Sequence, residues 1–557
     1  MAATAPLVPA GAPGMDRGGL GGETAAAFRP KPPTVVRSAA AAGGESTQAR
    51  ARWKTAKSSL AVASLAKRDK TGRMLTRKTV GRDAEVKDLK RKLKMLSRGE
   101  DGGIVMFEGG AGLGKSHMCR EAIKHAGRHE LRPLRGFCSA LKDSTPYFPF
   151  QCMLEELFEV TFLPIEQARQ KILDQVEEEW PHLYERIGLL NAVLPFHFDE
   201  SMKVSVLTGF ARLEGTKRFL LELLQGATES LDKLVLIFED VHWMDSLSWS
   251  LLADVSSSIH PLLIIITHRE WPEEFPPPVE YMELLQSERT KMYPLKGLSR
   301  HQTAELANRV LRVDALPEVV LATIVNRGGG NPFYIEEAVK YMKDRKVILL
   351  QGQPLKCITG DDFGARGKMP DNGLQMVTER FHSLDEPLRL ILKVGCVIGG
   401  SWTEAMVKGV HPFPSQLSQL AQNLDKLARH GFISTDQYQR VLDDSWDKSD
   451  EEQTLYSFSH SILEDMVYQL MPLAQRQELH RAAARYYEAA QTRMKAFLNP
   501  EDSSDSDDES VESIKEEQTA EEKTVPGFSL ALAHHWSHTS EPPMAAGFLV
   551  EAGRGSS

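Results

Sequence analysis

The sequence contains no apolar stretch long enough to cross a membrane. Its longest apolar runs, at 234–238 and 262–266, have the length of a strand, whereas a spanning helix needs roughly 18 or more apolar residues. Apolar residues make up 41% of the 557 residues and charged residues 26%, which is ordinary for a globular protein. We therefore expect a soluble protein with no membrane insertion.

Cysteine is also scarce. The five cysteines include no C-x-x-C pair, so the sequence indicates neither a zinc knuckle nor a disulfide framework. A reducing compartment is the simplest interpretation, and we expect a cytoplasmic protein, with nuclear or organellar import as the alternatives. The formal net charge of -9 disfavours general affinity for nucleic acid.

Large apolar side chains are rare in residues 1–50 and in residues 500–524. Residues 1–50 are rich in Ala, Gly and Pro, and residues 50–78 collect Lys and Arg. Residues 500–524 are acidic and contain serines that could accept phosphate, namely Ser503, Ser504 and Ser506. Such segments bury too little apolar surface to offset the entropy of ordering, so we expect them to be disordered. A chain of this length should hold at least two folded domains besides.

The most informative stretch is a glycine-rich loop between an apolar run and a segment with helical spacing. Gly109, Gly114, Lys115 and Ser116 fit the pattern G-x-x-x-x-G-K-[ST]. In this pattern backbone N–H groups surround nucleotide phosphates, the Lys reaches the β and γ oxygens, and the hydroxyl holds Mg²⁺. The nucleotide-binding residues predicted here are Gly109, Gly110, Ala111, Gly112, Leu113, Gly114, Lys115, Ser116 and His117.

Two acids follow the predicted strand at 234–238. In a P-loop site one acid positions Mg²⁺, and the other orients or deprotonates the attacking water. We assign the Mg²⁺ role to Glu239 together with Ser116, although Asp is commoner at that position, and the water-polarising role to Asp240. For this pair alone, a strand ending in a solvated turn is the alternative.

Further candidates follow this pair and the next predicted strand. Asp245 is predicted to cap a helix, while His242 and Trp243 are expected to pack beside the site without a catalytic task. Ligands bind at the carboxyl edge of open α/β sheets, so Arg269, after the strand at 262–266, is a candidate sensor of the γ-phosphate. An ion pair of Arg269 with a nearby acid is the alternative, the candidates being Glu270, Glu273 and Glu274.

The second half of the sequence is mainly helical. Asn331 is predicted to cap a helix whose first residue is Pro332, and contact of Pro332 with adenine is the functional alternative. Helical spacing at 384–397 and 417–427, followed by short strands at 431–434 and 455–460, indicates a winged helix. Acids near its second strand disfavour DNA phosphates, so we expect this domain to pack against the rest of the chain.

Together these motifs resemble the P-loop region of the soluble adenylyl cyclase (adenylate cyclase type 10) group, part of the STAND branch of AAA-like regulatory ATPases. The resemblance covers roughly residues 79–553. Its carriers are Val80-Gly81-Arg82-Asp83, Gly109 to Ser116, Pro146-Tyr147, Phe238 to Asp245, Thr267-His268-Arg269, Gly330-Asn331-Pro332 and Phe458-Ser459-His460. It implies an α/β fold: a P-loop NTPase (AAA/STAND-like) parallel sheet with a helical lid, then a winged-helix domain and a short helical C-terminal segment.

The resemblance also implies roles for residues outside the loop. Gly81 and Arg82 would lie near the base, Pro332 would contact adenine, and His460 would contact phosphate and lock the ADP state. ATP or ADP and Mg²⁺ are the implied cofactors. The predicted domains are a low-complexity then basic tail (1–78), the ATPase core (79–294), the lid (295–350), a loop (351–373), a winged-helix-like domain with helices (374–490), an acidic insertion (491–526) and the start of a helical repeat region (527–557).

Two departures from the family limit the functional expectation. No class III cyclase domain is recognisable and helical repeats are almost absent, so we expect no cyclase activity from this chain alone, and a short gene product, a fragment or a partial gene model. We expect a signalling switch that binds ATP and Mg²⁺ and hydrolyses ATP slowly, with an unknown protein partner that includes self-association as one form. A non-hydrolysing scaffold and a DNA-linked ATPase similar to origin-recognition proteins are the alternatives.

Overall fold

The computed structural model describes thirteen stretches of the chain, all within one compact unit, Ala56–Ser557. They are 79–139, 143, 145–160, 163, 165–230, 233–272, 276–352, 356–359, 370, 373–399, 401–437, 454–498 and 535–539. The predicted tail at 1–78, the acidic stretch with Ser503, Ser504 and Ser506, and most of 351–373 and 527–557 lie outside them. Within these stretches, no helix has both the length and the apolar content needed to cross a bilayer.

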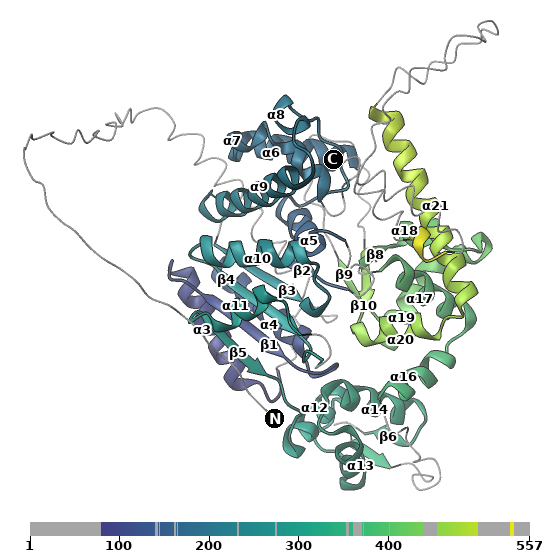
Figure 1. Cartoon of the computed structure of the whole chain (residues 1–557). Coiled ribbons are helices and arrows are strands. Elements are labelled where there is room, and N and C mark those ends of the chain that lie inside the picture. Colours follow the sequence, from purple (N-terminus) through teal and green to yellow (C-terminus); the bar gives the residue numbers. More distant parts are fainter. Residues whose placement is uncertain are drawn as a thin grey trace, which may run out of the picture. The chain divides into compact units, whose positions relative to one another are not determined.

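The predicted ATPase core is built on a five-stranded sheet with the order β2-β3-β4-β1-β5, and its strand pairs are parallel (Figure 1). The strands are β1 (Gly103–Glu108), β2 (Arg132–Phe137), β3 (Leu234–Glu239), β4 (Leu263–His268) and β5 (Thr290–Pro294). Strand β4 therefore lies between β1 and β3, with Glu108 opposite His268 and Phe238 opposite Ile266. This register brings the carboxyl ends of the three strands together, and the predicted parallel α/β sheet is confirmed.

Helices bury both faces of this sheet, because alternate side chains of a strand point to opposite faces. Val105 and Phe107 share one apolar cluster with side chains of α3 and α4, whereas Ile104 and Met106 belong to the cluster that holds side chains of α5 and α10. The helices are α3 (Asp83–Ser97), α4 (Lys115–Ala126), α5 (Phe148–Leu157), α10 (Ser246–Ser258) and α11 (Val279–Gln286). Burial on both faces explains why these strands appear in the sequence as continuous apolar runs.

A helical insertion separates β2 from β3. The sequence predicts a long helical region broken by prolines, and the structure confirms it: α7 begins at Pro181, and Pro195 lies between helices. After α5, the elements of this insertion are α6 (Ile165–Glu179), α7 (Pro181–Tyr184), the short 3-10 helix η2 (Ile187–Ala192), α8 (Met202–Ser205) and α9 (Gly209–Ser230).

Three helices follow the sheet as the predicted lid. They are α12 (Arg300–Leu311), α13 (Glu318–Gly328) and α14 (Pro332–Asp344), and a hairpin of β6 (Ile348–Gln351) and β7 (Lys356–Thr359) comes next. The helical pattern at 299–325 is two helices, because Arg312 adopts a left-handed φ of 60° at the end of α12 and Pro317 precedes α13. Such a residue ends a helix by closing its last turn.

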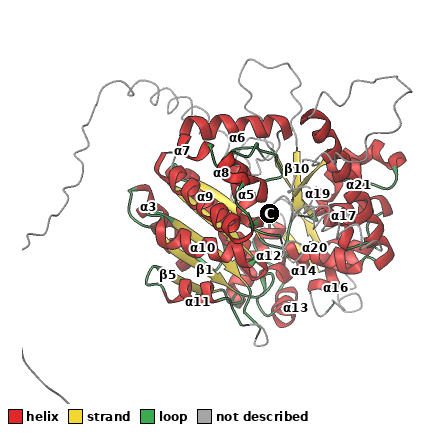
Figure 2. Cartoon of the chain, turned by 45° about the horizontal axis from the view of Figure 1, so that its top comes forward, coloured by secondary structure: helices red, strands yellow, loops and turns green. Residues whose placement is uncertain are grey.

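The C-terminal part combines helices with a small antiparallel sheet of order β8-β10-β9. Its elements are α16 (Gly373–His382), α17 (Glu386–Ile398), β8 (Ser401–Thr403), α18 (Glu404–Val410), α19 (Leu420–His430), β9 (Ile433–Gln437), β10 (Thr454–Phe458), α20 (Ser461–Leu470) and α21 (Leu473–Leu498). The two predicted helices and two predicted strands are present, and β8 and α18 are additional. Figure 2 shows the strands around β10, in yellow, apart from the larger sheet. The succession of helix, strand, two helices and two strands is compatible with the winged helix, which stays a prediction.

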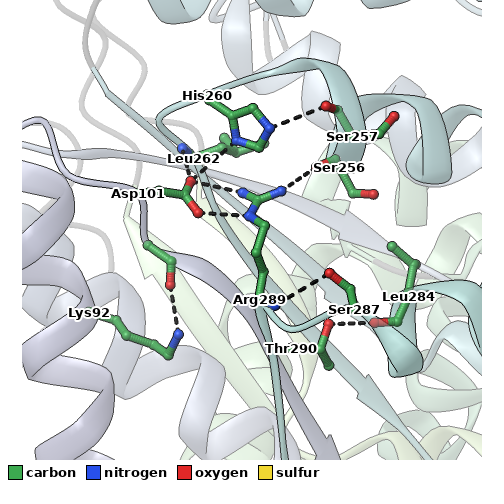
Figure 3. A network of polar contacts seen from close by, with 11 residues as sticks. Lys92, Asp101, Ser256, Ser257, His260, Leu262, Leu284, Ser287, Arg289 and Thr290 are labelled. Atoms are coloured by element: carbon green, nitrogen blue, oxygen red, sulfur yellow. Dashed lines mark hydrogen bonds and ion pairs between the residues drawn. The ribbon is translucent and has the colours of Figure 1, made fainter.

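The amino end of the large sheet is joined by polar contacts around Asp101 and Arg289 (Figure 3). Arg289 donates from Nε and Nη2 to the two Asp101 carboxylate oxygens, each at 2.8 Å, and from Nη1 to the Ser256 carbonyl. The Leu262 N–H donates to Asp101 Oδ1 at 3.1 Å. Burial alone would raise the pKa of Asp101, but the hydrogen bonds from Arg289 and Leu262 outweigh it and lower that pKa. These contacts connect the starts of β1, β4 and β5.

Candidate functional site

The glycine-rich loop lies between β1 and α4, as the motif requires. Gly112 and Gly114 have φ values of +80° and +98°, a region that side chains with a Cβ rarely adopt. A Cβ on Gly112 would also lie 2.7 Å from Asn331 Oδ1 and 2.7 Å from Phe333 Cβ. Glycine at 112 is therefore needed both for the turn and for the close approach of the lid.

Lys115 is the first residue of α4 and is buried under the loop. Its Nζ donates to the carbonyls of Gly109 at 2.9 Å and Gly110 at 3.2 Å, and lies 4.0 Å from Asp240 Oδ1. Burial lowers the pKa of this amine, an effect that Asp240 opposes. A buried ammonium held by neutral carbonyls would bind phosphate oxygens more strongly, because charge-assisted hydrogen bonds are the stronger kind.

The two predicted acids end β3 side by side. Burial raises the pKa of Glu239, and a hydrogen bond from Ser116 opposes that shift. Burial also raises the pKa of Asp240, against the attraction of Lys115 and Arg269. Asp240 has a left-handed φ of 56°, and its N–H donates to Thr267 Oγ1 at 2.9 Å, so β4 fixes the turn that positions this carboxylate.

Ser116 and Glu239, the predicted Mg²⁺ ligands, lie close enough for the Ser116 hydroxyl to oppose the burial-driven rise in the pKa of Glu239. A hydroxyl and a carboxylate are hard oxygen donors, and Mg²⁺ is usually held by one or two such groups together with waters and phosphates. The donor set therefore fits Mg²⁺. A cage of three or more His, Cys, Asp or Glu side chains is absent from the described stretches.

Arg269 follows β4 beside this centre, and its charge acts on both Lys115 and Asp240. Its Nη2 lies 3.5 Å from Asp465 Oδ2, on α20 of the C-terminal part. The expected alternative, an ion pair with a nearby Glu, is not what the structure shows for Glu270, whereas Glu273 and Glu274 lie outside the described residues. Sequence reasoning missed Asp465, because no local pattern links residues so far apart in the chain.

His242 lies in the short 3-10 helix η3 (Val241–Trp243), directly after Asp240. Both of its ring nitrogens are buried without a hydrogen-bond partner. Burial lowers the pKa of His242 to about 3, and the nearby charges of Arg269 and Lys115 add to the effect. Sequence analysis placed His242 beside the site but gave it no task, and only its surroundings in the fold single it out.

Arg82 ties the loop to the start of the lid. Its Nη2 donates to the carbonyls of Leu113 at 3.2 Å and Lys296 at 2.5 Å, and burial lowers the pKa of its guanidinium. Gly81 before it has a φ of +68°, and a Cβ there would lie 2.7 Å from Leu298 Cδ2. The geometry gives Arg82 a positioning task, and proximity of Gly81 and Arg82 to a base stays a prediction.

His117 is the last of the predicted loop residues. Its Nε2 lies 3.0 Å from Thr79 Oγ1. Burial lowers the pKa of His117 to about 4. The ring is therefore neutral near pH 7 and partnered by the segment before α3, and direct contact of His117 with nucleotide stays a prediction.

The lid meets the loop at the amino end of α14. The Asn331 side chain caps this helix by accepting the N–H groups of Phe333 at 3.0 Å and Tyr334 at 3.3 Å, and Pro332 is its first residue, as predicted. Asn331 Nδ2 also donates to the Ala111 carbonyl at 2.9 Å. The capping role is thus confirmed, and Pro332 lies next to the loop, while its adenine contact stays a prediction.

His460 comes from the C-terminal part and precedes α20. Its ring centroid lies 5.1 Å from that of Phe333 on α14, in an edge-to-face arrangement. Burial lowers the pKa of His460 to about 4. The structure therefore places His460 against the lid helix that touches the loop, and its phosphate contact stays a prediction.

Asp245 caps α10 as predicted. Its Oδ1 accepts the Ser248 N–H at 2.9 Å and the Tyr147 N–H at 3.4 Å. The same carboxylate thus holds the aromatic turn before α5 against the helix that follows β3. Asp245 therefore has a structural role beside the site, because it joins two of the elements that surround it.

Comparison with known proteins agrees with this geometry. Residues 78–265 match the AAA ATPase domain family. Adenylate cyclase type 10 of Oryctolagus cuniculus is 21% identical over 280 residues, which cover 49% of this chain and 17% of that protein. The chain thus matches about a sixth of the length of that relative. With the loop and the strand order, the family match gives the core the fold of a P-loop NTPase, as predicted.

Solved structures with similar folds are more distant. A STAND protein with a tetratricopeptide repeat sensor from Pyrococcus horikoshii has a TM-score of 0.39 and 14% identity, covering 88% of this chain and 59% of that chain. The ORC1 protein of Aeropyrum pernix, solved in complex with DNA, has a TM-score of 0.30 and 12% identity, covering 71% and 93%. Likeness at this level carries no argument about function.

Proposed function

Starting from the AAA ATPase domain at 78–265, we propose that this chain is a regulatory ATPase that binds ATP with Mg²⁺ and works as a signalling switch. In the proposed switch, the bound nucleotide determines how the lid and the C-terminal helices pack on the sheet. The observation that carries the proposal is the position of Arg269, which acts on Lys115 and Asp240 and also pairs with Asp465 on α20.

Binding would use Lys115 and Ser116 at the end of the loop, together with Glu239 at the end of β3. The Lys115 amine would exchange the carbonyls of Gly109 and Gly110 for the β and γ oxygens of ATP. Ser116 and Glu239 would hold Mg²⁺, which neutralises phosphate charge when bound. Phosphate oxygens would add negative charge beside Lys115 and Arg269, which otherwise interact with the carboxylates of Asp240, Glu239 and Asp465.

Hydrolysis would use Asp240 as the base. A water oxygen attacks the γ-phosphorus, the bond between that phosphorus and the β–γ bridging oxygen breaks, and ADP leaves with the bridging oxygen. The proton of the attacking water goes to the Asp240 carboxylate. A carboxylate whose pKa is raised by burial accepts a proton more readily than an exposed one, which suits Asp240 to this task.

The switch would rest on competition for Arg269. Without a γ-phosphate, the guanidinium pairs with Asp465; with ATP, the γ-phosphate offers a second and stronger anion. Loss of the Asp465 contact would free α20, and the neighbouring contact between Phe333 and His460 would respond because it joins the lid to the same helix. ADP lacks the competing group and would leave the pair intact.

Amide hydrogen exchange of α20 tests the switch. A non-hydrolysable ATP analogue with Mg²⁺ should speed exchange in α20, and ADP should not. Asp465→Asn should show the faster exchange with either nucleotide. Asp425→Asn, which removes an acid paired on the surface of α19, is the matched control and should behave like the wild type. Equal exchange with ADP and the analogue in the wild type would contradict the switch.

Phosphate release tests turnover separately. Wild type should release phosphate slowly and Asp240→Asn should reduce release to background. Background release in both proteins, with ATP still bound, would replace the switch with the non-hydrolysing scaffold. Salt-sensitive binding of duplex DNA would instead favour the DNA-linked ATPase.

A further inference from the structure

His242 is a half-buried side chain of the site that the proposed chemistry leaves without a task. Neither ring nitrogen has solvent exposure or a hydrogen-bond partner. Buried polar groups in native proteins nearly always have partners, since leaving one unpaired costs the full desolvation penalty. An imidazole with two such atoms therefore indicates a partner that binds there.

The backbone holds the His242 ring in place beside Asp240. The left-handed φ of 56° at Asp240 turns the chain out of β3, and η3 closes with hydrogen bonds from Trp243 N–H to Asp240 O at 3.1 Å and from Met244 N–H to Val241 O at 3.0 Å. The neighbouring Trp243 ring lies 5.2 Å away between centroids. The backbone of His242 is thus held by the turn that positions the proposed base.

One of the two missing partners must be a hydrogen-bond acceptor, and the other must be a donor. Arg269, Lys115 and His268 all disfavour a proton on His242, so the ring is neutral and carries one donor and one acceptor nitrogen. Arg269 Nε is a further buried atom without a partner. Arg269 and Lys115 both act electrostatically on His242. The Lys115 amine reaches the β and γ oxygens in this motif, so the unpaired nitrogens of His242 and Arg269 lie in the region expected to receive a terminal phosphate.

We propose that His242 recognises the γ-phosphate: its ring N–H donates a hydrogen bond to a γ-phosphate oxygen and so helps the site to distinguish ATP from ADP. The second ring nitrogen accepts a hydrogen bond from water. This inference rests on the proposed ATP binding and goes beyond it, because it makes His242 a specificity-determining residue. ADP has no oxygen at that position and leaves the ring nitrogen unpaired.

Paired affinity measurements test the proposal. Calorimetric titration with Mg²⁺ should show His242→Leu binding a non-hydrolysable ATP analogue about tenfold more weakly than wild type, the loss of one hydrogen bond to a charged group. Affinity for ADP should stay at the wild-type value. His242→Asn and His242→Gln carry an amide near the Nδ1 and Nε2 positions respectively, so the variant that restores analogue binding identifies the donating nitrogen.

Two controls separate this role from a structural one. His411→Leu removes a buried histidine whose Nδ1 accepts the Phe413 N–H at 3.2 Å, and it should leave both affinities unchanged. The thermal midpoint of His242→Leu without nucleotide should not fall, because the substitution removes two unpaired buried nitrogens, whereas His411→Leu should lower it. A lower midpoint for His242→Leu would show that the ring has a structural role instead.

The remaining outcomes are also decisive. If His242→Leu weakens the analogue and ADP equally, or neither, the γ-phosphate role is overturned. An ordered water as the only partner of the ring would give the second of these results. If the wild type binds neither nucleotide, the proposed function itself fails, and that failure is distinct because it precedes any comparison between variants.

Discussion

Partly buried polar and charged side chains are fully paired at one end of the large sheet and incompletely paired at the other. At the amino end, Asp101 and Arg289 satisfy each other, and the pKa of the carboxyl is lowered. At the carboxyl end, Glu239 and Asp240 have raised pKa values, and neither ring nitrogen of His242 has a hydrogen-bond partner. The same strands thus carry a completed polar network at one end and an incomplete one at the other.

The difference shows which end of the sheet lowers the stability of the protein without ligand. Groups that are buried without full compensation destabilise the free protein, and they cluster at functional sites because a ligand completes them. The amino-end network has no such deficit, since all three guanidinium nitrogens of Arg289 have acceptors. Substitutions at the two ends should therefore have opposite consequences for ligand affinity and for stability.

The largest contrast should come from two lysines. Lys115→Ala should weaken ATP binding by roughly 100-fold or more, because each hydrogen bond to a charged group contributes about 1.5–3 kcal/mol. Lys92→Ala removes an amine that donates to the Gly102 carbonyl at 2.8 Å at the amino end, and should leave ATP affinity unchanged. Calorimetric titration measures both, and similar affinities for the two variants would contradict the division of the sheet.

The next effect is on stability at the amino end. Arg289→Ala should lower the free energy of unfolding by about 2 kcal/mol, because it leaves Asp101 unpaired; the 26% and 35% exposure of the two side chains keeps the loss below that of a fully buried pair. Arg91→Ala breaks a pair on the surface of α3 and should cost less than about 0.5 kcal/mol. Urea unfolding measures both changes. Equal losses of unfolding free energy would show that the Asp101–Arg289 network stabilises the protein no more than the Arg91–Asp88 pair does.

A matched pair of aspartates gives a smaller effect of opposite sign. Asp240→Asn should raise the free energy of unfolding without nucleotide by about 1 kcal/mol, because it removes a carboxylate whose ionised form the fold disfavours. Asp101→Asn should lower it, because the fold favours the ionised form there. Unfolding curves at pH 7.5 decide this, and destabilisation by both substitutions would be evidence against an incomplete carboxyl end.

The smallest effect is the pH dependence of the stability changes caused by Asp240→Asn and Asp101→Asn. The raised pKa of Asp240 means that its penalty is present above that pKa and fades as pH falls toward the ordinary value of about 3.9. The lowered pKa of Asp101 means that its stabilisation is present above about pH 3.9 and is lost only below it. As pH falls from 7.5 toward about 4, the Asp240→Asn difference should shrink and the Asp101→Asn difference should stay constant; parallel changes would contradict the assigned shifts.

Much of the sheet and its loop could be predicted, because both depend on local sequence. Continuous apolar runs predicted β1, β3 and β4, and the glycine spacing predicted the loop that ends in Lys115 and Ser116 at the start of α4. The caps at Asp245 and Asn331 were predictable for the same reason, since a cap needs only the residues that follow it.

The remaining parts of the site depend on long-range packing. Asp465 reaches Arg269 only because α20 lies against the end of β4, and Arg82 reaches Leu113 and Lys296 only because three segments meet. The break of the lid helix at Arg312 depends on a left-handed residue that is not glycine, which the helical pattern does not reveal. The lack of hydrogen-bond partners at His242 could not be predicted, because it depends on the position of every element packed around the ring.

Identification of the nucleotide that co-purifies with the protein tests the central claim most directly. Wild type and Lys115→Ala would be purified in parallel and denatured, and the released small molecules identified by mass spectrometry. Our account predicts ADP or ATP from the wild type and none from the variant, and retained ADP would favour the state in which Asp465 holds Arg269. Wild type that carries no nucleotide and takes up none from Mg²⁺ and ATP, or equal amounts from both proteins, would contradict the account.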